Sequence, residues 1–417
     1  MDIATLSEKE IIITLLALGL LLLSAFIFGT LLEKIKGPRV VGEILGGMVL
    51  GGSCLYFFFP EVMSKVLMAY PEEGKVLNIF YQLGLIFLMF LSGYNTDIKV
   101  DRKNIKTIGL VFIGATILPM LGSIPFIGLF QDAFIGSTAN ATPYRLVFAI
   151  GVAITSIPVI SKIFFDMGIM NTNFSNTVLT VSTFQDLCLW ILLNIATKIA
   201  TDGSIDLISM IVIVFMTLGI FVVIAVIAKF IKSMRNDWKP ITFYTLSFVV
   251  LLVTSSLLYL AGINIMYSAF VVGYAVKAVF GTSDTTKTRM KYLENFSFSF
   301  FVPIYFALVG LRLNVIHDFN ILRFLLFFGI AFGLEFVGTF LMLLFARLRA
   351  ITKLNFAITM NARGGPGIVL ATVAYSYDII SIEFFTVLII TTMLSSMIAG
   401  YWLRLQKKKD RTVFDQL

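Results

Sequence analysis

The sequence predicts an all-α protein that crosses a membrane many times. Of its 417 residues, 58% are hydrophobic and only 13% are charged, and the mean hydropathy is +0.95. A soluble chain of this length could not hide so much apolar surface, whereas a chain in lipid presents it outward. Apolar stretches of about 20 residues, the length a helix needs to cross the hydrocarbon core, recur along the whole chain.

About thirteen transmembrane helices are predicted, separated by charged residues or by Gly, Pro and polar interruptions. The first is expected to be a retained span, because a cleaved signal peptide has a shorter apolar run and a basic start. Glycines in the second are expected to allow close helix packing. The predicted spans cover approximately residues 10–32, 38–58, 77–97, 104–130, 144–167, 172–198, 205–234, 239–261, 263–281, 289–312, 318–348, 353–376 and 382–405.

The basic residues predict the orientation of these spans. With the amino terminus outside, 24 of the 32 Lys and Arg residues fall on the cytoplasmic side, seven on the other, and Arg363 within a span. This asymmetry places the carboxyl terminus inside, with 406–417 as a short cytoplasmic tail, in an integral protein of the cell membrane. The net charge of +8 therefore reflects membrane orientation and not a nucleic-acid partner.

Three ionisable residues are predicted at mid-membrane depth: Asp186, Glu335 and Arg363. Such residues are costly in lipid and are candidates for function by default. Glu43 lies near the end of its span, where it is expected to reach water. Two Cys in apolar runs and a single His provide no disulfide framework, resident metal or cofactor site, and no nucleophile and base for an enzyme.

Two spans contain helix breakers at mid-depth. The fifth carries Thr155, Ser156 and Pro158, and the twelfth reads Asn-Ala-Arg-Gly-Gly-Pro from 361 to 366, including Gly364, Gly365 and Pro366. The prolines suit the first turn of a new half-helix, and Thr155, Ser156 and Asn361 can cap the freed backbone groups. Each span is therefore predicted to be two half-helices; the alternative for either one alone is a simple kink.

The positions of these breaks predict two inverted repeats, spans one to six and eight to thirteen, joined by the seventh. This pattern is typical of secondary transporters. Crossed half-helices bring partial charges of both signs to the midplane, where Asp186 and Arg363 can balance them. The alternatives are a structural role for Asp186 and a role for Arg363 only as its ion-pair partner.

Several segments resemble the second monovalent cation:proton antiporter family over nearly the whole chain. Residues 37–47 resemble the signature of that family's second span, and residues 87–93 resemble the end of its third. Its two broken crossing helices resemble 153–160 and Arg363-Gly364 of this chain, and its ninth and tenth spans resemble 262–273 and 303–313. The resemblance implies a single membrane transport domain that forms a homodimer. Its scaffold would be about 10–97 and 239–312, its linker helix 205–234, and its sliding core about 104–198 and 318–405.

The ion-site motif of this resemblance is Thr-Phe-Gln-Asp, which ends at Gln185 and Asp186. Gln-Asp looks most like the glutathione-gated potassium efflux antiporters, whose large nucleotide-binding domain is not expected here. Relatives that exchange two protons typically carry Asp-Asp, and electroneutral ones Asn-Asp. Electrogenic relatives carry a lysine where this chain has Glu335, so Glu335 is expected either to pair with Arg363 or to carry a second proton.

These residues together predict exchange of a monovalent cation, K⁺ or Na⁺, for H⁺ by competition at Asp186. Oxygens of Asp186, Gln185, Thr155 and Ser156 suit a dehydrated alkali cation. Because Gln185 is neutral, only Asp186 need release a proton, which predicts electroneutral one-for-one exchange. Two rival functions remain open, a cation sensor that moves no ion and a carrier for an organic anion.

Overall fold

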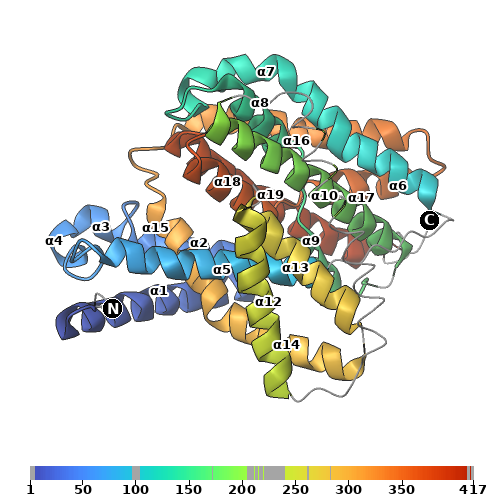
Figure 1. Cartoon of the computed structure of the whole chain (residues 1–417). Coiled ribbons are helices and arrows are strands. Elements are labelled where there is room, and N and C mark those ends of the chain that lie inside the picture. Colours follow the sequence, from blue (N-terminus) through green and yellow to red (C-terminus); the bar gives the residue numbers. More distant parts are fainter. Residues whose placement is uncertain are drawn as a thin grey trace.

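The computed structural model describes residues 5–95, 104–170, 172–203, 211, 215, 219, 240–260, 263–281, 283–410 and 414. In these residues the chain is helical apart from turns and one isolated bridge between Ile135 and Ile380 (Figure 1). Within the described residues, nine helical segments are long and apolar enough to cross a membrane, and α8 and α13 are shorter apolar helices. The predicted all-α membrane fold is confirmed. The predicted seventh span, 205–234, lies outside the described residues apart from three isolated positions, so the count of thirteen stays a prediction.

The other twelve predicted spans each coincide with helix. The elements are α1 (Glu8–Lys34), α2 (Arg39–Leu50), α3 (Leu55–Phe58), α4 (Pro60–Met63), α5 (Glu73–Asn95), α6 (Ile105–Phe112), η1 (Ile113–Ile117), α7 (Leu118–Phe134), α8 (Ala141–Val152), α9 (Ile157–Asp166), α10 (Asn173–Asp202), α12 (Pro240–Leu260), α13 (Ile265–Phe280), α14 (Asp284–Ser299), α15 (Phe301–Arg312), α16 (Ile321–Leu343), α17 (Ala350–Met360), α18 (Gly365–Ser376) and α19 (Ile382–Lys409).

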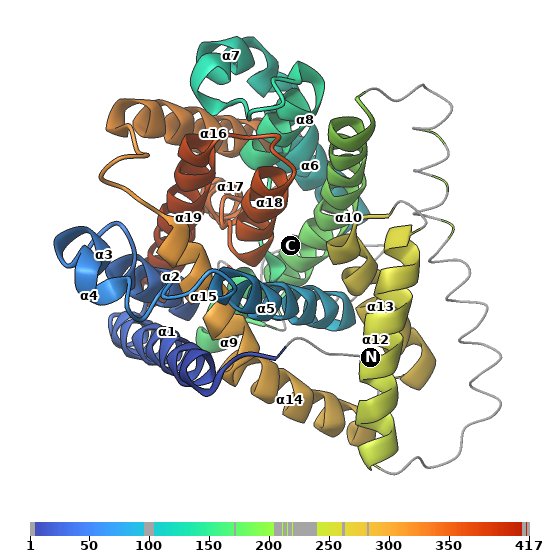
Figure 2. The same ribbon diagram turned by 60° about the vertical axis from the view of Figure 1, so that its left-hand side comes forward.

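The helices pack into two bundles, seen from two sides in Figures 1 and 2. The first bundle contains α1 to α5 and α12 to α15, and the second contains α6 to α10 and α16 to α19. For the part of the chain that the structure describes, every extensive helix–helix packing lies inside one bundle or the other. The two bundles are therefore separate packing units that meet along a thinner boundary.

Glycines let helices of the first bundle approach to backbone contact. A Cβ added at Gly47 would overlap the carbonyl of Ala307 on α15, and one at Gly310 would overlap the carbonyl of Ile44 on α2. Small residues at helix interfaces are how membrane helices gain van der Waals contact without a hydrophobic driving force. The role expected for the second-span glycines is confirmed at Gly47.

The fourth predicted span is interrupted by a turn of π-helix, η1, which was not expected. Pro119 has no N–H to donate to the carbonyl of Ala115, four residues earlier, so the regular ladder opens at this point. Gly114 of η1 lies against the backbone of Gly338 and Thr339 on α16. This close approach brings η1 next to the helix that carries Glu335.

The second and tenth predicted spans are also divided. α2 ends at Leu50, and a turn that contains Gly51 and Gly52 separates it from α3. α14 and α15 meet at Phe300, whose backbone is not helical, because Pro303 cannot donate to the carbonyl of Ser299.

Candidate ion-binding site

The fifth and twelfth spans are broken where the sequence predicts, and the two breaks touch. α8 ends at Val152 and α9 starts at Ile157, while α17 ends at Met360 and α18 starts at Gly365. The Ser156 N–H donates to the carbonyl of Ala362 at 2.8 Å, which joins the two connecting segments directly. The predicted pair of crossed, interrupted helices is therefore present.

Side chains at the breaks satisfy the helix ends, as irregular backbone at membrane depth requires. The Ser156 hydroxyl accepts from the Val159 N–H at 3.4 Å at the start of α9. At the end of α17, Thr155 donates to the carbonyl of Met360 at 2.6 Å, and Asn361 donates to that of Ala357 at 3.0 Å. The expected capping roles are confirmed.

The four residues predicted as helix breakers lie at the starts of the second half-helices. Pro158 is the second residue of α9, and Pro366 lies in the first turn of α18. A Cβ at Gly364 would overlap the side chains of Val159 and Ser156, whereas one at Gly365 would meet only Leu88, at 3.9 Å. The close contact between the two breaks therefore requires glycine at 364 and not at 365.

Arg363 and Glu335 form a buried ion pair beside the crossing. Arg363 Nη2 lies 2.9 Å from Glu335 Oε2 and donates to the carbonyl of Val152, the last residue of α8, at 2.8 Å. The Thr155 hydroxyl, whose one proton is donated to the Met360 carbonyl, also lies 3.1 Å from Glu335 Oε1. Both charged side chains are at most 1% exposed. Arg363 thus compensates the negative end of α8, as expected, and its ion pair is with Glu335 and not with Asp186.

Gln185 connects three segments that are far apart in the sequence. Its amide nitrogen donates to the carbonyl of Ala115 in η1 at 3.1 Å and to the carbonyl of Ala153 in the fifth-span break. The amide oxygen, Oε1, has no hydrogen-bond donor among the described residues. The amide orientation therefore leaves an oxygen available to a ligand.

Asp186 is buried and unpartnered. Its side chain is on α10 and 2% exposed, and neither carboxylate oxygen accepts a hydrogen bond from a residue that the structure describes. Buried hydroxyls of Thr116, Ser182 and Thr339 also lack partners within the same described residues. Because a buried charge without a partner is strongly unfavourable, this carboxylate needs a proton or a cation.

The structure places the remaining site predictions in two groups. Gln185 and Asp186 share α10, while Thr155 belongs to the network of Glu335 and Arg363, and Ser156 bonds to the second break. A direct role for Thr155 and Ser156 as cation ligands stays a prediction. The carbonyl of Ala115 was missed by the sequence analysis, although Pro119, four residues later, could have indicated a free carbonyl there.

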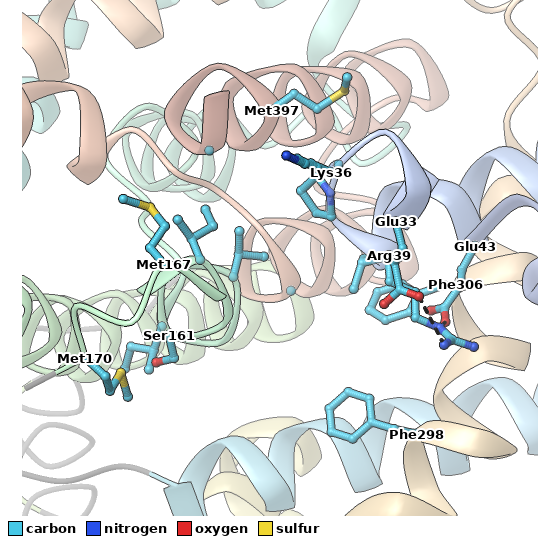
Figure 3. A pocket seen from close by; sticks show the side chains of 18 of the residues that line it. Glu33, Lys36, Arg39, Glu43, Ser161, Met167, Met170, Phe298, Phe306 and Met397 are labelled. Atoms are coloured by element: carbon cyan, nitrogen blue, oxygen red, sulfur yellow. Dashed lines mark hydrogen bonds and ion pairs between the residues drawn. The ribbon is translucent and has the colours of Figure 1, made fainter. Parts of the chain in front are cut away.

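A cavity of about 1490 Å³ lies between the two bundles. It is lined by Ile157 and Val159 at the start of α9, by Gly365 at the start of α18, and by residues of α1, α2, α5, α14, α15 and α19. Figure 3 shows Lys36, Met167 and Met397 around it. The cavity therefore reaches the crossing but does not include Asp186 in its lining.

Glu43 lines this cavity in an ion pair, which corrects the expectation that it reaches water. Its side chain is only 4% exposed and accepts from Arg39 Nε at 2.9 Å, and Arg39 also lies 3.6 Å from Glu33 (Figure 3). Arg39 precedes Glu43 by one helical turn on α2, so the pair forms within one helix.

Comparisons of this chain with known proteins agree on one family. The sequence profile of "Sodium/hydrogen exchanger, transmembrane" matches residues 22–406. The solved structure of the sodium proton antiporter MjNhaP1 from Methanocaldococcus jannaschii is similar in fold, with a TM-score of 0.66 and 20% identity, over 96% of this chain and 99% of that one.

Curated relatives agree with the profile. The chain is 23% identical to the Na(+)/H(+) antiporter of Enterococcus hirae, over 93% of this chain and 97% of that protein. It is 24% identical to the Na(+)/H(+)-K(+) antiporter GerN of Bacillus cereus, over 91% and 93%. It is also 24% identical to Cation/H(+) antiporter 17 of Arabidopsis thaliana, over 93% of this chain but 48% of that protein, so it spans about half the length of that relative. The profile covers most of the sequence, and the chain belongs to the sodium/hydrogen exchanger family.

Proposed function

We propose that this protein exchanges a monovalent cation, K⁺ or Na⁺, for H⁺ across the membrane, and that Asp186 binds both ions in turn. The observation that carries the proposal is the Asp186 carboxylate, which is 2% exposed and has no described hydrogen-bond donor. Such a group is stable when a proton or a cation neutralises it, and the two cannot occupy it together. Downhill movement of one ion then drives the other uphill.

The oxygen atoms near Asp186 support an alkali cation as the substrate. Gln185 has its amide oxygen free and its nitrogen committed to the carbonyls of Ala115 and Ala153. Hard oxygen ligands of this kind suit Na⁺ and K⁺. The names of the relatives from Enterococcus hirae and Bacillus cereus include sodium in both cases and potassium in one.

One-for-one exchange follows from the charges at the crossing. Glu335 compensates Arg363 at 2.9 Å, so their combined charge is zero. Among the described residues at the crossing, Asp186 is then the single uncompensated charge, and one proton or one monovalent cation neutralises it. The site is then neutral whether Asp186 carries the proton or the cation. No net charge moves in either direction, and the exchange is electroneutral.

Alternating access takes the form of an elevator in this proposal. The second bundle, which contains the crossing and Asp186, is the sliding core; the first bundle is the scaffold and the contact surface of a homodimer. The sparse packing between the bundles supports relative sliding. With the carboxyl terminus in the cytoplasm and the protein in the cell membrane, the cavity at the start of α9 and α18 is the cytoplasmic entrance.

Proton flux in proteoliposomes tests the proposal. A pH gradient is imposed, Na⁺, K⁺ or Li⁺ is added in turn, and collapse of the gradient is followed for the wild type and Asp186→Asn. The matched control is Asp202→Asn, which removes a carboxylate at the exposed end of the same helix, where it pairs with Lys198 at 2.8 Å. We expect cation-stimulated flux in the wild type and Asp202→Asn and none in Asp186→Asn.

Other outcomes would overturn the proposal in different ways. Cation binding that depends on Asp186 without flux would identify a sensor, and no response to any of the three cations would favour an organic-anion carrier. Flux that survives Asp186→Asn would show that exchange does not require Asp186, and it would favour Glu335 as the proton site.

A further inference from the structure

The boundary between the bundles is open at one end and closed at the other. The cavity lies toward the end where α19 finishes at Lys409, here called the C-terminal face, and side chains of both bundles line it. α15 ends at Arg312 on the other side, beside the end of α2 where Gly51 contacts Leu311. This side is called the opposite face.

A row of side chains closes the boundary on the opposite face. The exposed Arg312 guanidinium lies 4.2 Å from the centroid of the Tyr81 ring, which lies 5.0 Å from the Tyr305 ring. The Tyr305 hydroxyl and Thr372 Oγ1 are 3.2 Å apart. Tyr81, Tyr305 and Thr372 are each at most 2% exposed. Arg312, Tyr81 and Tyr305 belong to the first bundle and Thr372 belongs to the second. The row therefore ends in a hydrogen bond between the two bundles.

A second hydrogen bond connects the bundles on the same side. The Asn264 N–H, at the start of α13, donates to Asn194 Oδ1 of α10 at 2.9 Å. The Asn264 side chain in turn accepts from Met266 N–H at 2.9 Å and caps α13. The asparagine contact thus joins the helix of Asp186 to a capped helix end of the first bundle.

Both contacts lie beyond the crossing as seen from the cavity. Thr372 is seven residues past Gly365, which lines the cavity, and therefore lies roughly 10 Å farther along α18. Asn194 is eight residues past Asp186, roughly 12 Å along α10. Both contacts between the bundles are therefore at a depth between the crossing and the opposite face.

We infer that Tyr305 and Thr372 form the latch of a gate on the opposite face, closed in this structure while the cavity on the C-terminal face is open. The inference rests on the proposed exchange cycle. When the second bundle moves against the first, Thr372 moves away from Tyr305, and both buried hydroxyls lose their partner until water enters. The bond therefore stabilises the closed state of this face and sets how often it opens.

Cysteine accessibility tests the latch without any ion gradient. In a background with Cys54 and Cys188 replaced by alanine, Val369→Cys is the reporter, because Val369 is 1% exposed and lies one turn before Thr372 on α18. A membrane-impermeant maleimide is applied from the opposite face. Tyr305→Phe and Thr372→Val should each raise the labelling rate of the reporter cysteine about fivefold, because each substitution removes one buried hydrogen bond.

Matched controls separate the latch from general loosening. Tyr244→Phe changes a tyrosine on α12 of the first bundle, and Thr386→Val removes a buried hydroxyl that bonds within its own helix, to Ile382 at 2.9 Å. Both are expected to label at the parent rate. The double variant Tyr305→Phe/Thr372→Val is expected to label no faster than either single variant, since one bond is lost in each case.

The outcomes distinguish the latch from the exchange on which it rests. Unchanged labelling in Tyr305→Phe and Thr372→Val, in protein whose thermal unfolding matches the parent, would overturn the latch even if ion exchange is present. Labelling that rises as expected in a protein without cation-stimulated proton flux would support the gate as a structural device and overturn the exchange.

Discussion

Arg363 and Glu335 form an ion pair at 2.9 Å, fully inside the second bundle and next to the crossing of two interrupted helices. The two residues are 28 positions apart, Glu335 on α16 and Arg363 in the break between α17 and α18, and Arg363 also holds the carbonyl end of α8. The pair therefore fixes α16 to both breaks and removes the net charge that an isolated arginine would bring to the site.

Removing one partner of this pair is expected to destabilise the protein strongly. Glu335→Gln would leave Arg363 buried and uncompensated, and loss of one member of a buried pair costs about 3–5 kcal/mol. The matched control is Glu383→Gln, whose partner Arg323 is 45% exposed at 2.8 Å, with an expected cost of about 1 kcal/mol or less. Thermal unfolding in detergent measures both. Equal stability of the two variants would contradict a structural role for the Arg363–Glu335 pair.

Two adjacent glycines are expected to respond differently to alanine. Gly364→Ala would place a Cβ inside Ser156 and Val159 and push the breaks apart, so ion exchange should be lost. Gly365→Ala would meet only Leu88 at 3.9 Å and should retain exchange. Proton flux and the amount of folded protein in the membrane are measured for both. A Gly364→Ala protein with full activity would show that the contact is not required.

Turnover is expected to be independent of membrane voltage. If one cation replaces one proton on Asp186, no net charge crosses the membrane, whereas each uncompensated charge would contribute about 2.3 kcal/mol per 100 mV. The measurement is cation-stimulated proton flux at clamped potentials of either sign, with Asp186→Asn liposomes to subtract leak. A rate that changes with the sign of the potential would show that net charge moves.

The π-helical turn is expected to matter for cation binding. Pro119→Ala would supply the N–H that Ala115 lacks, and Ala115 would then bond within its helix and release Gln185. Loss of one hydrogen bond that positions Gln185 should weaken the apparent cation affinity by about fivefold.

Pro125→Ala is the control, because Pro125 is in the same helix but beyond the turn. Its apparent affinity should equal that of the wild type. The comparison uses KM for the cation in flux assays. Equal KM values for the two variants would show that the π-helical turn does not affect cation binding.

Competition at one carboxylate predicts a specific pH dependence. At low pH protons occupy Asp186 and the apparent cation affinity falls, by up to about tenfold per pH unit; at high pH the free carboxylate binds the cation and the affinity reaches a plateau. The maximal rate at saturating cation should change much less. KM and maximal rate measured at several pH values on the cation side check this. A falling maximal rate with constant KM would instead indicate a separate titrating group.

The sequence by itself determined the features that depend on local composition. Apolar stretches of sufficient length predict helices because the hydrocarbon core imposes that length, and every predicted span within the described residues contains helix. The breaks at 153–156 and 361–364 were predicted because Pro, Gly and capping side chains act on their immediate neighbours. Asp186, Glu335 and Arg363 were found because charged residues are rare in apolar runs.

Only the tertiary structure decided which of these residues meet. Arg363 could have paired with Asp186 or Glu335, and the choice depends on how α16 packs beside the crossing. The contact of Gln185 with Ala115 joins residues 70 positions apart, and Gly364 meets Ser156 across two spans. Side-chain periodicity specifies the buried face of a helix but not its partner, so such contacts arise from packing of whole helices against one another.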